Sequence, residues 1–230
     1  MKFHAIIPAR KGSKGIKNKN MYSFLDKPLI EHTVLAALNS LYLDSITVST
    51  NDDNILEYCS KYELELLKRP DEICMDNSNS NEIIKHFIEN TLIKGLTHSD
   101  YIVFLQPTSP FRSNIHIDEA ISAIKNNGYG SLISIVESDK SPYKSFKIKD
   151  NKLHAIFSEE FLNRPRQELT QTFHPNGAIY IFNIGLFLKN KVFPNNGSHP
   201  YIMDNFSSID IDKIDDINYA TWLYNNLKSV

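Results

Sequence analysis

The sequence is short of cysteine, of long hydrophobic runs and of an excess of charge of either sign. Two cysteines in 230 residues, Cys59 and Cys74, exclude a disulfide framework and do not have the spacing of a metal knuckle. No apolar run approaches the roughly 20 residues that span a bilayer, and no secretion signal opens the chain. We therefore expect free thiols in a soluble, cytoplasmic protein without a membrane partner.

The charge balance argues against nucleic acid as a partner. The formal net charge is −2, whereas domains that bind nucleic acid usually present a net basic face. The chain also lacks a Pro/Gly/Ser-rich stretch long enough to be a linker, and its length suffices for one sizeable core. We expect a single domain over residues 1–230, with a hairpin inserted at about 138–166.

Two familiar nucleotide-binding motifs, the Walker loop and the Gly-x-Gly-x-x-Gly loop, are also missing. In their place the segment IPARKGSKGIKNKN, from Ile7 to Asn20, follows an apolar run that starts at Phe3. Its two glycines, Gly12 and Gly15, allow the backbone to come close to a ligand. Its positive charges are Arg10, Lys11, Lys14, Lys17 and Lys19. Glycines and cations at the end of a first strand predict a site for the phosphates of a nucleotide rather than a solvated basic turn.

Apolar runs alternate with amphipathic stretches along the first 137 residues. The runs that predict strands lie at about 3–8, 45–50, 64–68, 101–106 and 131–137. The stretches that predict helices lie at about 29–40, 52–62, 81–94 and 115–126, with a last helix at about 215–228. This alternation predicts an α/β fold with a mostly parallel, doubly wound sheet, and a strand from Gly177 to Phe182 rejoins it. The runs 143–149 and 152–157, separated by Asp150-Asn151, predict a hairpin insertion.

A second polar loop, LQPTSPFR, follows the buried run from Tyr101 to Leu105. Its two prolines end the strand and hold an irregular, rigid backbone. The polar side chains that this loop would fix at the sheet edge are Gln106, Thr108, Ser109 and Arg112. Because the carboxyl ends of parallel strands meet at one edge, the two loops should face the same ligand.

An acidic pair lies near the end of the sequence, in the segment SIDID. Asp210 and Asp212 are two residues apart, so an extended backbone would place both on one side and turn Ile209 and Ile211 toward apolar surroundings. Magnesium prefers oxygen ligands and usually binds through one or two carboxylates together with substrate phosphates. Helix capping can explain Asp215 and its neighbour, but Asp210 lies too far upstream. The pair therefore predicts a magnesium site.

Four segments, IPARKGSKGIKNKN, LQPTSPFR, RPRQELTQTFHPNGAIYI and SIDID, together resemble the bacterial N-acylneuraminate cytidylyltransferases, also called CMP-sialic acid synthetases. The resemblance spans nearly the whole chain. It implies a Rossmann-like nucleotidyltransferase fold with a small hairpin for dimerisation. It also implies a homodimeric, Mg²⁺-dependent enzyme of surface polysaccharide synthesis that joins CTP to a nine-carbon 2-keto sugar acid and releases pyrophosphate.

The resemblance assigns roles one position at a time. It implies that Arg10, Lys14 and Lys19 hold the triphosphate and act in catalysis with the metal-binding pair, Asp210 and Asp212. The nucleotide contacts that it implies run along the first loop: Pro8, Ala9, Arg10, Gly12, Ser13, Lys14, Lys19 and Asn20. The sugar contacts that it implies are Gln106, Lys144, Arg166, His174 and Phe193. Of these, Lys144 resembles a lysine that reaches from the hairpin of one subunit into the pocket of the other.

Departures from the family pattern leave the sugar acid open. His174 stands where many relatives carry an arginine, which removes a permanent cation, and Met75-Asp76-Asn77 and Leu169-Thr170 also differ. N-acetylneuraminic, legionaminic and pseudaminic acids all remain candidates. An eight-carbon 3-deoxy sugar acid is an alternative, although such enzymes carry a Ser-Thr-Arg-Leu-Pro-Gly-like run where this chain has residues 13–18. A non-catalytic nucleotide-sugar sensor is a further alternative, and the retained cations and acidic pair favour an enzyme over it.

Overall fold

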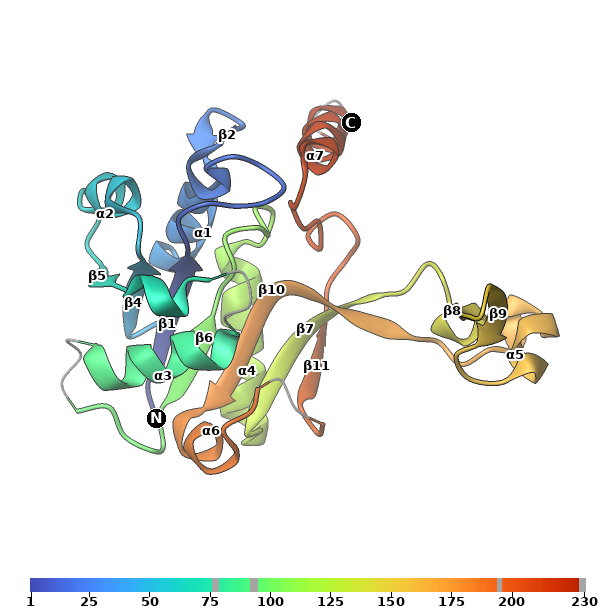
Figure 1. Ribbon diagram of the computed structural model, residues 1–230. Coiled ribbons are helices and arrows are strands. Elements are labelled where there is room, and N and C mark those ends of the chain that lie inside the picture. The colour runs from blue at the N-terminus through green and yellow to red at the C-terminus, as the bar shows by residue number, and fades with distance from the viewer. Residues whose placement is uncertain (76–78, 92–94, 194–195, 228–230) are drawn as a thin grey trace.

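A seven-stranded sheet forms the centre of the protein (Figure 1). The computed structural model describes residues 1–75, 79–91, 95–193 and 196–227, so Asp76 and Asn77 lie outside the described residues. The strands are β1 (Phe3–Ala9), β4 (Ser45–Thr50), β5 (Glu65–Lys68), β6 (Tyr101–Phe104), β7 (Ser131–Glu137), β10 (Phe173–Asn183) and β11 (His199–Ile202). Their order is β11-β7-β10-β6-β1-β4-β5. Only β10 runs antiparallel to its neighbours in this sheet of the described residues.

Helices cover both faces of the sheet. The helices that cover it are α1 (Leu29–Leu38), α2 (Asp53–Cys59) and α4 (Asn114–Asn127) on one face and α3 (Ser80–Asn90) and α6 (Ile184–Asn190) on the other. Two more helices, α5 (Glu159–Asn163) and α7 (Ile214–Leu227), lie away from these two clusters. Among these helices of the described residues, none has both the length and the apolar character that crossing a bilayer requires.

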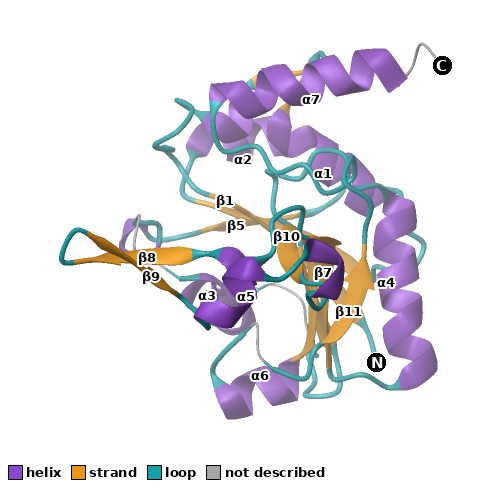
Figure 2. Cartoon of the chain, turned by 90° about the vertical axis from the view of Figure 1, so that its right-hand side faces the viewer, coloured by secondary structure: helices purple, strands orange, loops and turns teal. Residues whose placement is uncertain are grey.

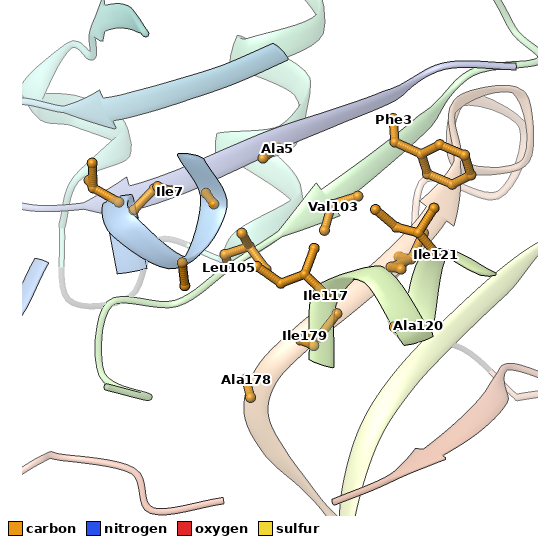
Figure 3. Packing of buried hydrophobic residues seen from close by; sticks show 14 of the residues in the cluster. Phe3, Ala5, Ile7, Val103, Leu105, Ile117, Ala120, Ile121, Ala178 and Ile179 are labelled. Carbon is orange, nitrogen blue, oxygen red and sulfur yellow. The ribbon is translucent and has the colours of Figure 1, made fainter. Parts of the chain in front are cut away.

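The alternating side chains of β1 explain why helices are needed on both faces. Phe3, Ala5 and Ile7 belong to a core cluster that includes residues of α1, α2 and α4 (Figure 3). Ile6 points to the other face, into a cluster that includes Ile84 of α3 and residues of α6. A strand buried on both sides in this way must be covered by two layers of helices.

The α/β fold with a mostly parallel sheet that the sequence predicts is confirmed. The six predicted strands and five predicted helices are present, with ends that differ by a few residues, and residues 92–94 of one predicted helix lie outside the described residues. The short elements α5, α6 and β11 were not expected. Each has four to seven residues, which is too short to show a clear hydrophobic period.

The expected hairpin also forms. β8 (Phe146–Lys149) and β9 (Lys152–Ala155) pair antiparallel around Asp150 and Asn151, whose φ angles are 52° and 56°. Positive φ at both central residues is the requirement of a two-residue type I′ turn, and Asp and Asn tolerate it well. Together with α5, the hairpin forms an arm that projects away from the central sheet (Figures 1 and 2).

Candidate active site

A pocket of about 400 Å³ lies beyond the carboxyl ends of β1, β5 and β6. Four parts of the chain form its walls: the first polar loop, residues 69–75 with the start of α3, the LQPTSPFR loop with the end of β6, and the acidic segment. Its lining residues are Pro8, Arg10, Gly12, Ser13, Lys19, Asn20, Arg69, Ile73, Cys74, Met75, Ser80, Ile83, Phe104, Gln106, Pro107, Thr108, Asp210 and Asp212. The predicted nucleotide loop and the predicted metal pair therefore face the same space.

Local hydrogen bonds fix the conformation of the first polar loop. Gly12 has a φ of 74°, which favours glycine, and a Cβ at this position would meet no atom within 4 Å. The Asn20 side chain donates to the carbonyl of Arg10 at 3.1 Å, so the two ends of the loop are tied together. Asn51 accepts from the backbone N–H of Lys11 at 2.7 Å. These contacts fix the loop.

Gly15 is needed for a different reason from the one expected. An added Cβ would lie 2.0 Å from the carbonyl oxygen of Asp212, so only glycine allows this approach. The close contact is with the acidic segment of the same chain rather than with a ligand. Gly15 thus brings the cation loop against the carboxylates.

A small apolar cluster holds the acidic segment beside the loop. Ile211 is fully buried in a cluster that also contains Ile16 and Phe24, and Ile209 packs against it. The backbone N–H of Ile211 donates to the carbonyl of Thr108 at 2.8 Å. The isoleucines thus face inward, as the alternating SIDID pattern predicts, and the neighbouring Asp side chains line the pocket. The capping expected near residue 215 comes from Asp216, which accepts from the N–H groups of residues 212 and 213.

The two carboxylates have different surroundings. Lys19 donates from Nζ to Oδ1 of Asp212 at 2.9 Å and to the carbonyl oxygen of Ile211 at 3.0 Å. Desolvation raises the pKa of Asp210, and a hydrogen bond with Thr108 opposes that rise. Asp210 is solvent-accessible, but its place within a concave wall explains why desolvation still dominates.

The donor set fits magnesium. A partly desolvated carboxylate at Asp210 and a second at Asp212 are hard oxygen ligands beside a space large enough for substrate phosphates. No group of three or more His, Cys, Asp or Glu side chains converges within the described ranges, so protein atoms alone do not form a closed cage there. Such sites are typical of magnesium that is bound together with phosphates.

Arg69 is a pocket residue that the sequence reasoning missed. It follows β5, is 3% exposed, and its Nε and Nη1 have no hydrogen-bond partner in the described structure. Desolvation lowers its pKa, and the nearby Cys74 opposes that effect. A buried guanidinium with unpaired N–H donors destabilises the folded protein unless an anion or another acceptor binds to those donors. Its position directly after a predicted strand was the feature of the sequence that could have identified Arg69 as a pocket residue.

A smaller pocket of about 70 Å³ adjoins the first and shares Ser80, Phe104 and Gln106 with it. Phe193 and Tyr180 complete its apolar wall, with ring centroids 5.6 Å apart. Two of the predicted sugar contacts are thus found here: Gln106 lines both pockets, and Phe193 lines the smaller one. Phe193 is only 7% exposed and also packs in the core.

The other predicted sugar contacts lie elsewhere in the chain. Lys144 and Arg166 belong to short 3-10 turns of the arm, and His174 lies at the start of β10, where Nδ1 is 3.0 Å from Ser138 Oγ. Neither pocket is lined by these three side chains within the described residues. Of the predicted nucleotide residues, Ala9 is buried in β1 and Lys14 is exposed outside the pocket lining.

Two of the polar residues expected at the sheet edge are structural. Arg112 is 2% exposed and donates from Nη1 to the carbonyls of Gln106 and Ala178, each at 3.0 Å, and from Nη2 to Thr33. Desolvation lowers its pKa to about 9. Ser109, in the same loop, is fully buried. Arg112 therefore ties the loop to β10 rather than facing the pocket.

The fold and the pocket are those of the α/β nucleotidyltransferase class: the predicted nucleotide loop after the first strand and an acidic pair line one pocket. Comparison with known proteins narrows this class. The family model described as cytidylyltransferase matches residues 4–229. The chain belongs to the cytidylyltransferase family.

Curated relatives include three kinds of sugar-acid enzyme. An N-acylneuraminate cytidylyltransferase of Escherichia coli is 36% identical over 95% of this chain and 51% of its own length. A CMP-N,N'-diacetyllegionaminic acid synthase of Legionella pneumophila is 32% identical, with 92% and 91% covered. A pseudaminic acid cytidylyltransferase of Campylobacter jejuni is 28% identical, with 97% of each covered. The chain spans about half the length of the E. coli relative and of the similar Streptococcus agalactiae enzymes.

Solved structures show the same fold at low sequence identity. A CMP:2-keto-3-deoxy-manno-octonic acid synthetase complexed with CTP has a TM-score of 0.71 at 13% identity, covering 99% of this chain and 100% of its own. A 2-C-methyl-D-erythritol 4-phosphate cytidylyltransferase of Francisella tularensis has a TM-score of 0.68 at 16% identity, with 96% and 99% covered. Identities this low support the fold alone.

Proposed function

We propose that the protein is a cytidylyltransferase that joins CTP to a nonulosonic acid, giving a CMP-sugar and pyrophosphate. The observation that carries this proposal is the shared pocket: Arg10 and Lys19 of the first loop line it together with Asp210 and Asp212 of the acidic segment. The curated relatives named for N-acylneuraminate, pseudaminic and legionaminic acids support the substrate class.

The reaction requires a sugar hydroxyl to attack the α-phosphorus of a nucleotide that carries about four negative charges. Two unit charges about 4 Å apart interact by roughly 4 kcal/mol near a protein surface, so fixed cations matter for the rate. Arg10 and Lys19 neutralise the triphosphate from the pocket wall as charge moves to the leaving pyrophosphate, and Lys14 adds positive charge from outside the lining. Asn20 fixes the loop that carries them. Magnesium held by Asp210 and Asp212 would supply Lewis-acid polarisation of the phosphate when bound.

The protein acts as a homodimer in this proposal, because the arm exposes a large apolar surface. A two-stranded hairpin is marginally stable alone, and exposed apolar patches commonly mark interfaces. The exposed fractions along the arm are 46% for Phe146, 77% for Ile148, 64% for Leu153, 51% for Ile156 and 55% for Phe157. A second copy that covers this arm would bury these side chains.

Dimerisation also gives a role to the residues that lie far from the pocket of their own chain. Lys144 and Arg166 of the arm would reach the sugar-acid end of the pocket in the other copy, with His174 at the base of the arm. Sedimentation velocity tests this arrangement. Ile148→Lys with Leu153→Lys should give monomers with much reduced turnover and unchanged nucleotide binding, whereas Lys147→Glu, on the same strand, should remain dimeric.

Pyrophosphate release is the direct test of the function. Purified protein with Mg²⁺ and CTP should release pyrophosphate with one of N-acetylneuraminic, legionaminic or pseudaminic acid, and chromatography should show the matching CMP-sugar. ATP and GTP should not replace CTP. Pyrophosphate release with an eight-carbon 3-deoxy sugar acid instead would change the substrate assignment. No pyrophosphate release with any sugar acid would favour a nucleotide-sugar sensor. We place the reaction in the cytoplasm, where CTP is available and buried thiols such as Cys59 stay reduced.

A further inference from the structure

Asn176 is a buried polar side chain at the irregular point of β10. It is 5% exposed and lies where the pairing of β10 with β7 shifts register. Its Oδ1 accepts from Ser134 Oγ at 2.6 Å and from the backbone N–H of Ala178 at 3.1 Å. Its Nδ2 donates to Ser208 Oγ at 2.8 Å and to the sulfur of Met203 at 3.3 Å. All four hydrogen-bonding positions of the amide are therefore used.

One of these bonds reaches the acidic segment. Ser208 is two residues before Asp210, in a stretch that belongs to neither a helix nor a strand. Its backbone bonds are those of a local turn, from the Ser208 N–H to the Asp204 carbonyl at 3.1 Å and from the Ile209 N–H to the Phe206 carbonyl at 3.3 Å. Such bonds shape the turn, and contacts with other segments attach it to the sheet. Downstream of Asp210, the backbone of Ile211 is fixed to Thr108 at 2.8 Å. The bond to Asn176 is the matching attachment upstream, so Asp210 lies between two anchored points.

We propose that the hydrogen bond from Asn176 to Ser208 sets the position of the Asp210 carboxylate, which makes Asn176 a positioning residue for nucleotidyl transfer. This inference rests on the proposed function. Residues that orient metal-binding carboxylates without touching the metal commonly change metal affinity or activity about 10- to 100-fold when they are replaced. A misplaced Asp210 weakens the metal site while the nucleotide loop stays intact.

The choice of variant separates positioning from folding. Replacing Asn176 would break four hydrogen bonds at once and lower stability in any case. Ser208→Ala removes only the end of the network that touches the acidic segment, and Ser208→Thr keeps the hydroxyl. Ser134→Ala is the matched control, because it removes a fully buried hydroxyl from the opposite end of the same network.

The experiment measures Mn²⁺ binding in the presence of CTP by electron paramagnetic resonance, together with kcat, the KM for CTP and the melting temperature. Ser208→Ala should weaken Mn²⁺ binding and lower kcat by about 10- to 100-fold, with little change in KM for CTP or in melting temperature. Ser208→Thr should restore both values. Ser134→Ala should lower the melting temperature and leave Mn²⁺ binding unchanged.

Three results would overturn the inference: wild-type Mn²⁺ affinity in Ser208→Ala, equal weakening in Ser134→Ala and Ser208→Ala, or no Mn²⁺ binding by the wild-type protein. A different measurement, pyrophosphate release, tests the proposed function. If the wild-type protein binds Mn²⁺ with CTP but releases no pyrophosphate with any sugar acid, the function fails. The comparison of Mn²⁺ affinities between Ser208→Ala and the wild type still decides the role of Asn176.

Discussion

Lys19 Nζ lies 2.9 Å from Oδ1 of Asp212, across 193 positions of sequence. This ion pair joins the first loop of the chain to the acidic segment, and both of its residues line the pocket. In the proposed reaction the lysine contacts phosphate and the carboxylate contacts magnesium. Binding of nucleotide and metal would therefore replace the Lys19–Asp212 ion pair by a lysine–phosphate contact and a carboxylate–magnesium contact. Phosphate binding to Lys19 would release Asp212 for the metal, and metal binding to Asp212 would release Lys19 for the phosphate.

Lys19→Ala should raise the KM for CTP about 10- to 100-fold and change the KM for the sugar acid little, because a charge-assisted contact with phosphate is lost. Steady-state kinetics with each substrate varied in turn measures both values. Lys17→Ala, an exposed lysine of the same loop, is the control and should behave as the wild type. A normal KM for CTP in Lys19→Ala would mean that Lys19 only braces the acidic segment.

Asp210→Asn should lower kcat by several orders of magnitude while the melting temperature stays close to that of the wild type. The amide keeps the shape of the side chain but is a much weaker ligand for a hard divalent cation. Turnover under saturating CTP and sugar acid at several Mg²⁺ concentrations measures the effect. Asp215→Asn, in the first turn of α7, is the matched control and should keep near-normal turnover. Near-normal turnover of Asp210→Asn itself would remove the metal assignment.

Much of this architecture could be predicted because it depends on local patterns. The apolar run at Phe3–Ile7 followed by glycines and cations already defines a strand and a loop at its carboxyl end. The SIDID alternation likewise predicts which side chains of that segment are buried, and Ile211 is indeed at 0% exposure. Local patterns of this kind need no knowledge of distant partners.

The remaining features depend on contacts between distant segments. Arg69 follows a predicted strand, yet it is buried in a pocket to which the first loop and the LQPTSPFR loop also contribute. The need for glycine at position 15 comes from the backbone of Asp212, which is 197 positions away in sequence. In the proposed homodimer Lys144 and Arg166 act on the pocket of the other copy, and within one described subunit neither residue lines the larger pocket.

Gly15→Ala should abolish most of the turnover because its Cβ would lie 2.0 Å from the carbonyl of Asp212 and displace the acidic segment. Overpacking of this kind also lowers stability by about 1–3 kcal/mol. Gly128→Ala, at a φ of 66° with no atom within 4 Å of the added Cβ, should lose about 1–2 kcal/mol from backbone strain alone. Thermal unfolding and turnover of the two variants separate the effects. Normal turnover of Gly15→Ala would show that the segment can shift without consequence.

Cys74 should be alkylated by N-ethylmaleimide in the free protein and protected by CTP, because it lines the pocket at 7% exposure. Desolvation raises its pKa and Arg69 opposes that rise, so labelling should accelerate as the pH increases through the alkaline range. Cys59 is the internal control: it is fully buried, with its pKa raised to about 11, and should label only on unfolding. Peptide mass spectrometry assigns the site, and equal Cys74 labelling with and without CTP would contradict a nucleotide in this pocket.

His4 should make the protein less stable in mild acid. Burial lowers its pKa below the ordinary value of 6.5, so the unfolded chain binds the proton more readily than the folded one. Stability is therefore lost as the pH falls through 6.5 toward the lower pKa of the folded state. Urea unfolding at pH 7.5 and at pH 5.5 should show a smaller free energy of unfolding at the lower pH. His4→Gln should reduce this difference and His154→Gln, at an exposed position of β9, should not. If His4→Gln keeps the full wild-type difference, proton binding at other groups accounts for the acid sensitivity.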